Sequence, residues 1–309
     1  MLNFFKTEFK LFKLINFIDT IKNLNLDGYS FVNFSVGFNK NAYILTCKPC
    51  NENNCNKYVY AVIEVIIDWN NKKVLDTKYF LLGVHRFEYN LIQPIENDFL
   101  LIYPRSNYND GNPNKNGIVI DRGGNVKKYI CFGDGILNCI VRKDNSIITS
   151  YFDEGIFGNY GWEYPVTPIG NSGLILWDKD GNILWENKKY DISDCYAISL
   201  DTKENLWFYY YTDFNLVKTD FHNNDELYAS KLHGSSGFVV NSNLDKFLFR
   251  GGYGDYNSFY ILSKASGKIK KSSKVKLTFN SNELQISNCS LTRPQMLFMV
   301  SQDIYAYEF

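Results

Sequence analysis

KDNSIITSY (143–151) and LWDKDGNILW (176–185) are the two turn patterns that decide the fold of this sequence. In the first pattern a short polar tip precedes an apolar strand. In the second an apolar strand reaches an Asp, crosses a polar turn and continues as another apolar segment. Tips rich in Asn, Asp and Gly between apolar runs are typical of β-hairpins. Residues 143–185 therefore predict two hairpins.

The two patterns alternate along the rest of the chain. The first recurs at 38–46, 95–103, 203–211, 244–250 and 293–300, and the second at 66–75, 119–129, 218–228 and 262–270. A period of about 40 to 60 residues is that of a four-stranded propeller blade. We therefore predict an all-β, six-bladed β-propeller as a single domain over residues 1–309. The blades are expected at 29–80, 85–130, 133–190, 193–231, 234–275 and 276–309. A seven-bladed ring would need more hairpins than the sequence offers.

The last predicted blade lacks a fourth strand, because the sequence ends with its third, DIYAYEF (303–309). The N-terminal segment KTEFKLFKL (6–14) alternates apolar and polar residues and belongs to no other blade. We expect it to complete the last blade and close the ring, which would hide two sheet edges. A helix over residues 4–21 is the alternative, since that segment also fits a helical period.

Composition supports a β fold and limits the partners. The chain has 23 Tyr, 24 Phe and 5 Trp, and alanine occurs six times. Aromatic side chains favour strands, whereas alanine favours helices. The 33 basic and 33 acidic residues give zero net charge. Binding to nucleic acid or to an anionic membrane surface needs an excess of Lys and Arg, so neither partner is expected.

The sequence also predicts a cytoplasmic protein. It contains no apolar run long enough for a transmembrane helix, and lysines interrupt the N-terminal segment where a secretory signal needs an unbroken apolar run. The seven cysteines are an odd number and are scattered, which favours reduced thiols over a disulfide framework. We expect a monomer with no cofactor.

The connections between strands differ in length on the two faces of a propeller. The a–b and c–d turns are short, whereas the b–c connections are long and rich in Gly, Asn and Pro, too much so to be strands. These long loops lie at 47–57, 104–117, 152–173 and 250–258. Binding groups concentrate on long loops held by a rigid scaffold. The b–c and d–a face is therefore the predicted binding face.

Charged and aromatic side chains on that face are the candidate site residues. The acid/base candidates are Asp153, Glu154 and His233, and in extended backbone the adjacent carboxylates would point apart. The ligand-binding candidates are Arg105, Asp134, Tyr160, Trp162, Arg250, Tyr253 and Asp255. Arginine suits carboxylate or phosphate groups, and loop aromatics can stack on planar ligands. Internal salt bridges and rings that fix their own loops are the alternative roles.

Metal binding has weaker support. Cys47, Cys50 and Cys55 have partial zinc-site spacing, with His85 as a fourth candidate ligand. Asp134, Asp153 and Asp194 are candidate ligands for a divalent cation. The sequence has no P-loop, no Rossmann glycine motif and no nucleophile elbow.

FGDGILNC (132–139), YFDEGIFGN (151–159) and GLILWD (173–178) resemble a group of uncharacterised bacterial six-bladed propeller-like proteins. The shared features are a Gly-Asp-Gly-Ile step, the YFDEGxFGN run and a Gly-Leu-x-x-Trp-Asp strand. They cover about a sixth of the chain. The resemblance implies a propeller in a bacterial cytoplasm and carries over no catalytic residue.

Two functions remain as hypotheses from the sequence. The first is a binding module for a protein or polar small molecule on the b–c and d–a face. The second is a hydrolase or lyase for a polar, sugar-like or lactone substrate. In that case Asp153 or Glu154 would be the acid or base, and His233, Arg105 and Arg250 would position the substrate.

Overall fold

The structure is a computed structural model that describes residues 6–50, 57–222 and 224–309. It is an all-β, six-bladed β-propeller, as the turn patterns predict. Each blade is built on four antiparallel strands that are neighbours in sequence order, except where the N-terminus contributes. The described strands form six blades, so the seven-bladed alternative is wrong. The chain divides into two compact units.

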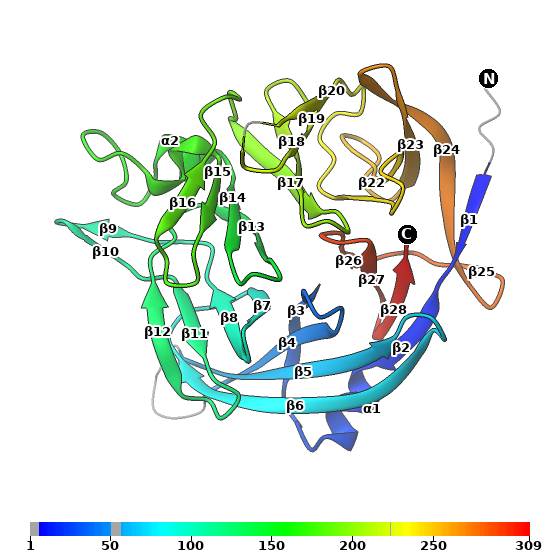
Figure 1. Ribbon diagram of the computed structural model, residues 1–309. Helices are drawn as coiled ribbons and strands as arrows, with labels where there is room; N and C mark the ends of the chain where they lie inside the picture. Colours follow the sequence, from blue (N-terminus) through cyan, green and yellow to red (C-terminus); the bar gives the residue numbers. More distant parts are fainter. Residues whose placement is uncertain (1–5, 51–56, 223) are drawn as a thin grey trace. The chain divides into compact units, whose positions relative to one another are not determined.

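The first unit, Asn16–Tyr190, contains blades one to three (Figure 1). A short helix, α1 (Phe17–Asn23), precedes them, and the Asn16 side chain caps it by accepting from the Asp19 N–H at 3.1 Å. Blade one contains β3 (Ser30–Val36), β4 (Ala42–Pro49), β5 (Tyr58–Asp68) and β6 (Lys73–His85). Blade two contains β7 (Leu91–Ile95), β8 (Asp98–Ile102), β11 (Gly117–Ile120) and β12 (Val126–Ile130), with the β9 (Tyr108–Asn109) and β10 (Asn112–Pro113) hairpin in its b–c loop. Blade three contains β13 (Ile136–Val141), β14 (Ile147–Tyr151), β15 (Leu174–Trp177) and β16 (Ile183–Glu186), with α2 (Asp153–Phe157) and the 3-10 helix η1 (Ile169–Ser172) in its b–c loop.

The second unit, Asp191–Phe309 with the N-terminal residues up to Ile15, contains blades four to six. Blade four contains β17 (Asp194–Leu200), β18 (Leu206–Tyr211), β19 (Leu216–Thr219) and β20 (Glu226–Tyr228). Blade five contains β21 (Phe238–Val240), β22 (Lys246–Arg250), β23 (Phe259–Ala265) and β24 (Lys268–Phe279), with β25 (Asn282–Glu283) paired to the end of β24. Blade six contains β26 (Asn288–Ser290), β27 (Gln295–Val300) and β28 (Asp303–Glu308).

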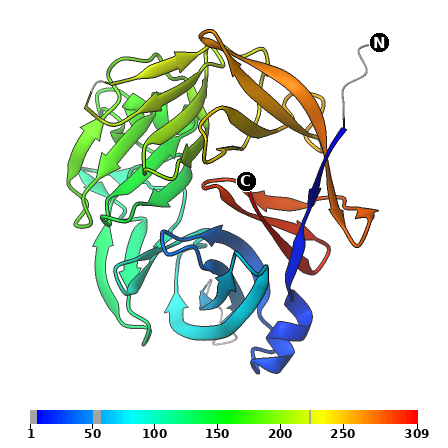
Figure 2. The same ribbon diagram turned by 45° about the vertical axis from the view of Figure 1, so that its right-hand side comes forward.

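The N-terminal segment completes blade six, which confirms the predicted strand but corrects its position. The fourth strand is β2 (Phe12–Asn16), which lies beside β28, whereas β1 (Lys6–Lys10) pairs in parallel with residues 274–278 of β24 (Figure 2). Because β24 is 12 residues long, it offers an edge for this extra strand. Stacking of Phe9 on Tyr307, with ring centroids 4.4 Å apart, fixes the segment. A helix over residues 4–21 is wrong, since the described helix spans only Phe17–Asn23.

The recurring Asp of the second turn pattern closes its own hairpin. In the β11–β12 turn, Asp121 Oδ1 accepts from the backbone N–H groups of Gly123 at 2.9 Å and Asn125 at 2.8 Å. Asn125 Nδ2 also donates to the same carboxylate. The same Asp and Asn pair, four residues apart, closes the turns at Asp178 and Asp220. The repeat in the sequence therefore reflects a side-chain-stabilised turn.

Aromatic side chains fill the spaces between neighbouring blades within each unit. In the first unit Tyr43 and Phe99 are fully buried, and their ring centroids are 6.1 Å apart. In the second unit Tyr209 and Phe249 are fully buried, and their ring centroids are 5.6 Å apart. Most of the unusual aromatic content is therefore core packing. Among the described helices, none is long and apolar enough to cross a membrane.

Candidate functional site

The b–c loop of blade three begins as the helical turn α2, which corrects the extended backbone predicted for Asp153 and Glu154. Both carboxylates are exposed in its first turn. The turn packs so closely on the preceding d–a segment that a side chain at Gly155 would collide with the Asp134 backbone oxygen. The Gly-Asp-Gly-Ile segment (133–136) and the Asp-Glu-Gly segment (153–155) therefore pack against each other.

Arg105, just after β8, lies between two carboxylates from blade three. Its Nε donates to Asp134 Oδ1 at 3.0 Å and its Nη2 donates to Asp134 Oδ2 at 2.9 Å. Its Nη1 lies 2.5 Å from Glu154 Oε2. Asp134 Oδ1 also accepts from the Ser106 backbone N–H at 2.8 Å. The structure thus brings together three sequence candidates, Arg105, Asp134 and Glu154.

Aromatic rings flank the same guanidinium. The Arg105 Cζ atom lies 4.4 Å from the centroid of Tyr160 and 5.3 Å from that of Phe152. A cation over a ring face is attracted by the quadrupole of the ring. Tyr160 is half exposed, so one side of its ring stays open to solvent.

The charges of this cluster stabilise one another. Burial raises the pKa of Asp134, although the Ser106 N–H and Arg105 oppose that effect. Hydrogen bonds from Asn159 and Arg105 lower the pKa of Glu154. Burial acts to lower the pKa of Arg105, but the two carboxylates outweigh it and raise that pKa. Glu154 is therefore held as a charged carboxylate, which does not suit a general acid near neutral pH.

Trp162 is buried and holds the loops of blades two and three together. Its Nε1–H donates to the Ser106 backbone oxygen at 2.7 Å, and its ring centroid lies 4.9 Å from that of Tyr108. Tyr108 begins the β9–β10 hairpin, so the expectation that this b–c loop contains no strand is wrong. A ligand-stacking role for Trp162 stays a prediction, and its ring is 3% exposed.

A polar cavity of about 470 Å³, here called the Arg86 pocket, lies beside Arg105 in the first unit. Its walls come from the connection between blades one and two and from the b–c loop of blade two. The lining residues are Tyr58, Arg86, Phe87, Glu88, Tyr103, Arg105, Asn107 and Asn114. The Tyr58 hydroxyl donates to Glu88 Oε1 at 2.5 Å. Arg86 is exposed, and no acidic group of the described residues lies within ion-pair distance of it.

In the second unit, His233 and Tyr253 lie together. The Tyr253 N–H donates to the His233 backbone oxygen at 2.9 Å, and the His233 ring stacks on Phe214 with centroids 4.6 Å apart. The hydroxyls of Tyr253 and Tyr196 are 2.5 Å apart. This group presents exposed aromatic edges, and no carboxylate in the described part of the chain is hydrogen-bonded to the His233 ring.

Arg250 and Asp255 bind within their own loop. Arg250 Nε donates to the Tyr256 backbone oxygen at 2.8 Å, and Asp255 accepts a hydrogen bond from the Tyr260 hydroxyl. Asp194 lies at the start of β17 and is partly buried. Ligand contacts for these three side chains stay predictions.

Two of the zinc candidates, Cys47 and His85, lie on strands of blade one. Cys47 lies within β4 and pairs across the sheet with Tyr60, so the strand runs further than the predicted loop boundary. His85 Nε2 lies 2.8 Å from the Leu82 backbone oxygen. Cys50 follows β4, and Cys55 lies outside the described residues. Within the described ranges, no three His, Cys, Asp or Glu side chains gather as a metal site, including Asp134, Asp153 and Asp194.

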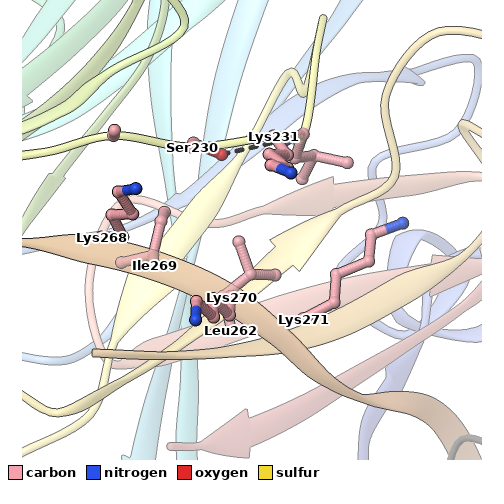
Figure 3. Close-up of a pocket in the computed structure, with 9 residues that line it drawn as sticks. Ser230, Lys231, Leu262, Lys268, Ile269, Lys270 and Lys271 are labelled. Carbon is pink, nitrogen blue, oxygen red and sulfur yellow. Dashed lines mark hydrogen bonds between the residues drawn. The ribbon is translucent and has the colours of Figure 1, made fainter. Parts of the chain in front are cut away.

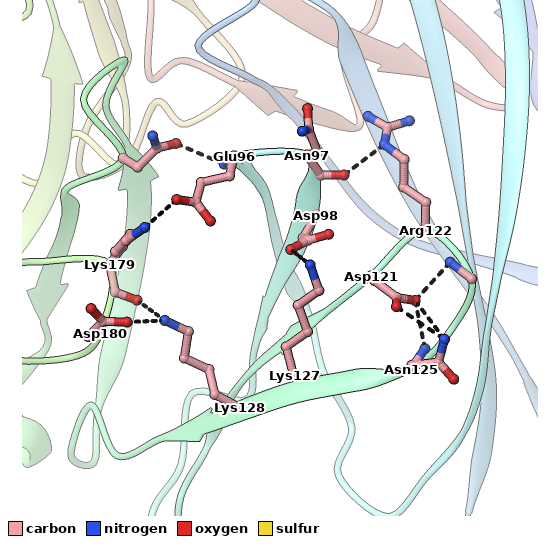
Figure 4. A network of polar contacts seen from close by, with 12 residues as sticks. Glu96, Asn97, Asp98, Asp121, Arg122, Asn125, Lys127, Lys128, Lys179 and Asp180 are labelled. Carbon is pink, nitrogen blue, oxygen red and sulfur yellow. Dashed lines mark hydrogen bonds and ion pairs between the residues drawn. The ribbon is translucent and has the colours of Figure 1, made fainter.

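The a–b and c–d turns of blades two and three have a different character. Their charged side chains form ion pairs with one another, as Figure 4 shows. Lys127 lies 2.7 Å from Asp98, Lys179 lies 2.5 Å from Glu96, and Lys128 lies 2.5 Å from Asp180. A cavity of about 390 Å³ lies beside Asp98 and Lys127. Paired surface charges of this kind leave few groups for a ligand.

Sequence reasoning did not identify Tyr58, Glu88, Asn107 and Asn114 as site residues. Tyr58 is the first residue of β5 and directly follows the predicted b–c loop of blade one, which ends at residue 57. The two asparagines lie in an asparagine-rich stretch without a distinguishing pattern. The one sequence feature that points to this pocket is the His-Arg pair at 85–86, which lies in a d–a connection on the predicted binding face.

Comparisons with known proteins support the fold. A catalytically inactive variant of virginiamycin B lyase from Staphylococcus aureus with quinupristin has a TM-score of 0.51 and 9% identity, covering 97% of this chain and 98% of that chain. A streptogramin B lyase structure has a TM-score of 0.47 and 10% identity, covering 97% and 86%. At 9% identity the likeness to the first of these structures is one of fold alone. No curated protein matches the sequence. Over residues 169–307, from the end of blade three into blade six, the chain is similar to the YxzG family.

Proposed function

We propose that the chain is a binding module that holds a polar ligand in the Arg86 pocket. The ligand is a small molecule, or a protein segment of the same chemistry, that presents a carboxylate or phosphate group. The observation that carries this proposal is the exposed Arg86 guanidinium at the rim of a polar cavity whose wall includes Arg105.

The size and lining of the pocket support a ligand of this kind. A volume of about 470 Å³ falls in the range of small-molecule sites. Asn107 and Asn114 offer amide donors for the anionic group, whereas the Glu88 carboxylate accepts from the Tyr58 hydroxyl and can accept only from a neutral or cationic donor of the ligand. A guanidinium binds a carboxylate or phosphate with two parallel hydrogen bonds.

Arg105 has a supporting role in this proposal. Asp134 and Glu154 together engage all three nitrogens of its guanidinium and hold it in place at the wall of the pocket. Arg86 therefore supplies the charge for the ligand, and Arg105 supplies a fixed polar surface.

A hydrolase or lyase acting on a sugar-like or lactone substrate is less well supported. The interactions of Glu154 hold it as a charged carboxylate. Asp153 precedes it on the same helical turn, and the described residues offer no second pair of carboxylates there. The fold likeness to virginiamycin B lyase carries no chemistry to this chain.

We also propose that the module works in a bacterial cytoplasm as a monomer. No disulfide is formed among the described cysteines, and the motif resemblance of the third blade points to bacterial proteins.

Thermal unfolding of the full chain with a panel of small anions tests the proposal. The panel contains citrate, succinate, inorganic phosphate and glucose 6-phosphate, with glucose as the neutral member. A ligand that binds only the folded state raises the melting temperature with its concentration. We expect at least one anion to do so, and Arg86→Gln to abolish that rise. The matched control is Lys72→Gln, which removes an exposed cation from the β5–β6 turn. An equal rise in the Arg86→Gln variant, or no rise with any anion, would contradict the proposal.

A further inference from the structure

A third cavity lies in the second unit, between the chain that follows β20 and the first residues of β24. Its volume is about 460 Å³, and here it is called the lysine groove (Figure 3). It is lined by Ala229, Ser230, Lys231, Leu232, Leu262, Lys268, Ile269, Lys270 and Lys271. Two of the lining residues, Ala229 and Lys268, form an isolated parallel bridge.

The floor of the lysine groove is apolar. Leu232, Leu262 and Ile269 are almost fully buried and belong to the core cluster between blades four and five. The groove thus opens directly onto core side chains. An apolar body placed there would pack on the accessible atoms of these side chains and on the aliphatic stems of the surrounding lysines.

The rim of the groove is cationic. Lys231, Lys268 and Lys270 are exposed, and within the described chain none of the three is paired with a carboxylate. Glu226 of β20, the strand that precedes the groove, already accepts from Lys218 and Lys264. The amine of Lys271 lies 3.6 Å from the centroid of the Tyr260 ring. The rim therefore has uncompensated positive charge.

We propose that the lysine groove binds a small anionic amphiphile, an aliphatic chain with one terminal carboxylate. The aliphatic chain lies on Leu232, Leu262 and Ile269, and the carboxylate meets Lys231 and Lys271. Lys271 follows Ile269 by two residues on β24 and pairs across the sheet with Leu262, so it shares their face of the sheet. The site does not depend on the function proposed for the Arg86 pocket.

The backbone around the groove argues against a peptide strand as the occupant. The Ile269 N–H already donates to the Ala229 backbone oxygen at 3.0 Å, and β1 occupies the edge of β24 from Lys274 to Thr278. Only a few residues of that edge remain for a further strand. A volume of about 460 Å³ instead fits a compact ligand.

Edge lysines have another established use, which is to keep sheet edges from pairing with other chains. That role needs the charges but not the apolar floor. The two roles differ in one respect that can be measured, because only the binding role predicts a saturable site for an aliphatic carboxylate.

Calorimetric titration of the full chain with decanoate tests the proposal, with decanol and butyrate as probes that lack the charge and the chain length. We expect one saturable decanoate site and much weaker binding of both controls. Lys231→Gln with Lys271→Gln should weaken decanoate binding by about tenfold or more, since charged hydrogen bonds are the stronger ones. Lys246→Gln, an exposed lysine on β22 of the same blade, should leave it unchanged.

A decanoate analogue with a photoreactive group at the tail then locates the chain. We expect cross-links to peptides that contain Leu232, Leu262 or Ile269. Absence of saturable binding, equal binding of decanol, unchanged affinity in the double variant or cross-links elsewhere would each overturn the proposal. Unchanged far-ultraviolet circular dichroism of the double variant excludes unfolding as the cause of lost binding.

Discussion

Arg105 and Asp134 form a two-pronged hydrogen-bonded pair, with Nε 3.0 Å from Oδ1 and Nη2 2.9 Å from Oδ2. The pair joins blade two to the start of blade three, and the Asp134 side chain is 1% exposed. A buried carboxylate that loses its cation destabilises the folded state. Removal of Arg105 should therefore destabilise the protein.

Arg105→Gln should lower the free energy of unfolding by about 3 kcal/mol, because it leaves the Asp134 carboxylate buried without a cation. Arg105→Lys should recover only part of the loss, because an ammonium cannot donate in parallel to both carboxylate oxygens. Urea unfolding of the two variants measures both effects. The control is Arg86→Gln, which should change stability by less than about 0.5 kcal/mol. Equal stability of Arg105→Gln and the unaltered protein would contradict the structural role of the pair.

Trp162→Phe should destabilise the loops of blades two and three. It keeps an aromatic ring but removes the Nε1–H that donates to Ser106, and it leaves that backbone oxygen buried without its partner. The expected cost is about 1 to 2 kcal/mol. Thermal unfolding measures it, together with the rate of proteolysis in residues 152–173. A ligand-stacking role alone would leave both quantities unchanged.

Gly155→Ala should disrupt the packing of α2 on the d–a segment, because the new methyl group would collide with the Asp134 backbone oxygen. Overpacking of this kind typically costs about 1 to 3 kcal/mol. Gly123→Ala is the control, since the nearest neighbours of its added carbon are side-chain atoms of Asp121 and Asn125 at 3.2 and 3.3 Å and not backbone. Unfolding curves of the two variants should differ clearly, and superimposable curves would show that the contact tolerates a methyl group.

Stability should fall in acid. Hydrogen bonds from Lys218 and Tyr228 lower the pKa of Glu226 from 4.5 to about 2. A carboxylate with a depressed pKa in the folded state stabilises fully above its unfolded value, and the contribution is lost as the pH falls through the folded value. The hydrogen bonds of the turns lower the pKa values of Asp121, Asp178 and Asp220 in the same sense.

The unfolding midpoint in urea should therefore decrease between about pH 5 and pH 2. Glu226→Gln should make that decrease shallower and leave the slope above pH 6 unchanged. A midpoint that stays constant down to pH 2 would contradict the assignment of these carboxylates.

The fold was predictable because its turns are local. Asp121 and Asn125 lie four residues apart in sequence, and the hydrogen bonds that close their hairpin involve only those few residues. Repetition of this local pattern was enough to count the blades. The register of the N-terminal strand was not predictable in the same way, because β1 and β2 both alternate apolar and polar residues and only the tertiary edges distinguish them.

The candidate site was partly predictable. Arg105, Asp134 and Glu154 were each candidates from their loops, but their mutual pairing depends on how α2 packs on Gly135, which no local pattern encodes. Trp162 was predicted as a loop aromatic, and its burial follows from the β9–β10 hairpin beneath it. The residues of the Arg86 pocket come from four segments of the chain, so their convergence is a property of the tertiary structure.

A crystal structure of the full chain with the panel anion that raises the melting temperature most locates the bound ligand directly. We expect the carboxylate or phosphate of that anion within hydrogen-bond distance of the Arg86 guanidinium, on the side of the pocket lined by Asn107. An anion bound elsewhere on the chain, with the Arg86 pocket filled by solvent alone, would contradict the proposed function.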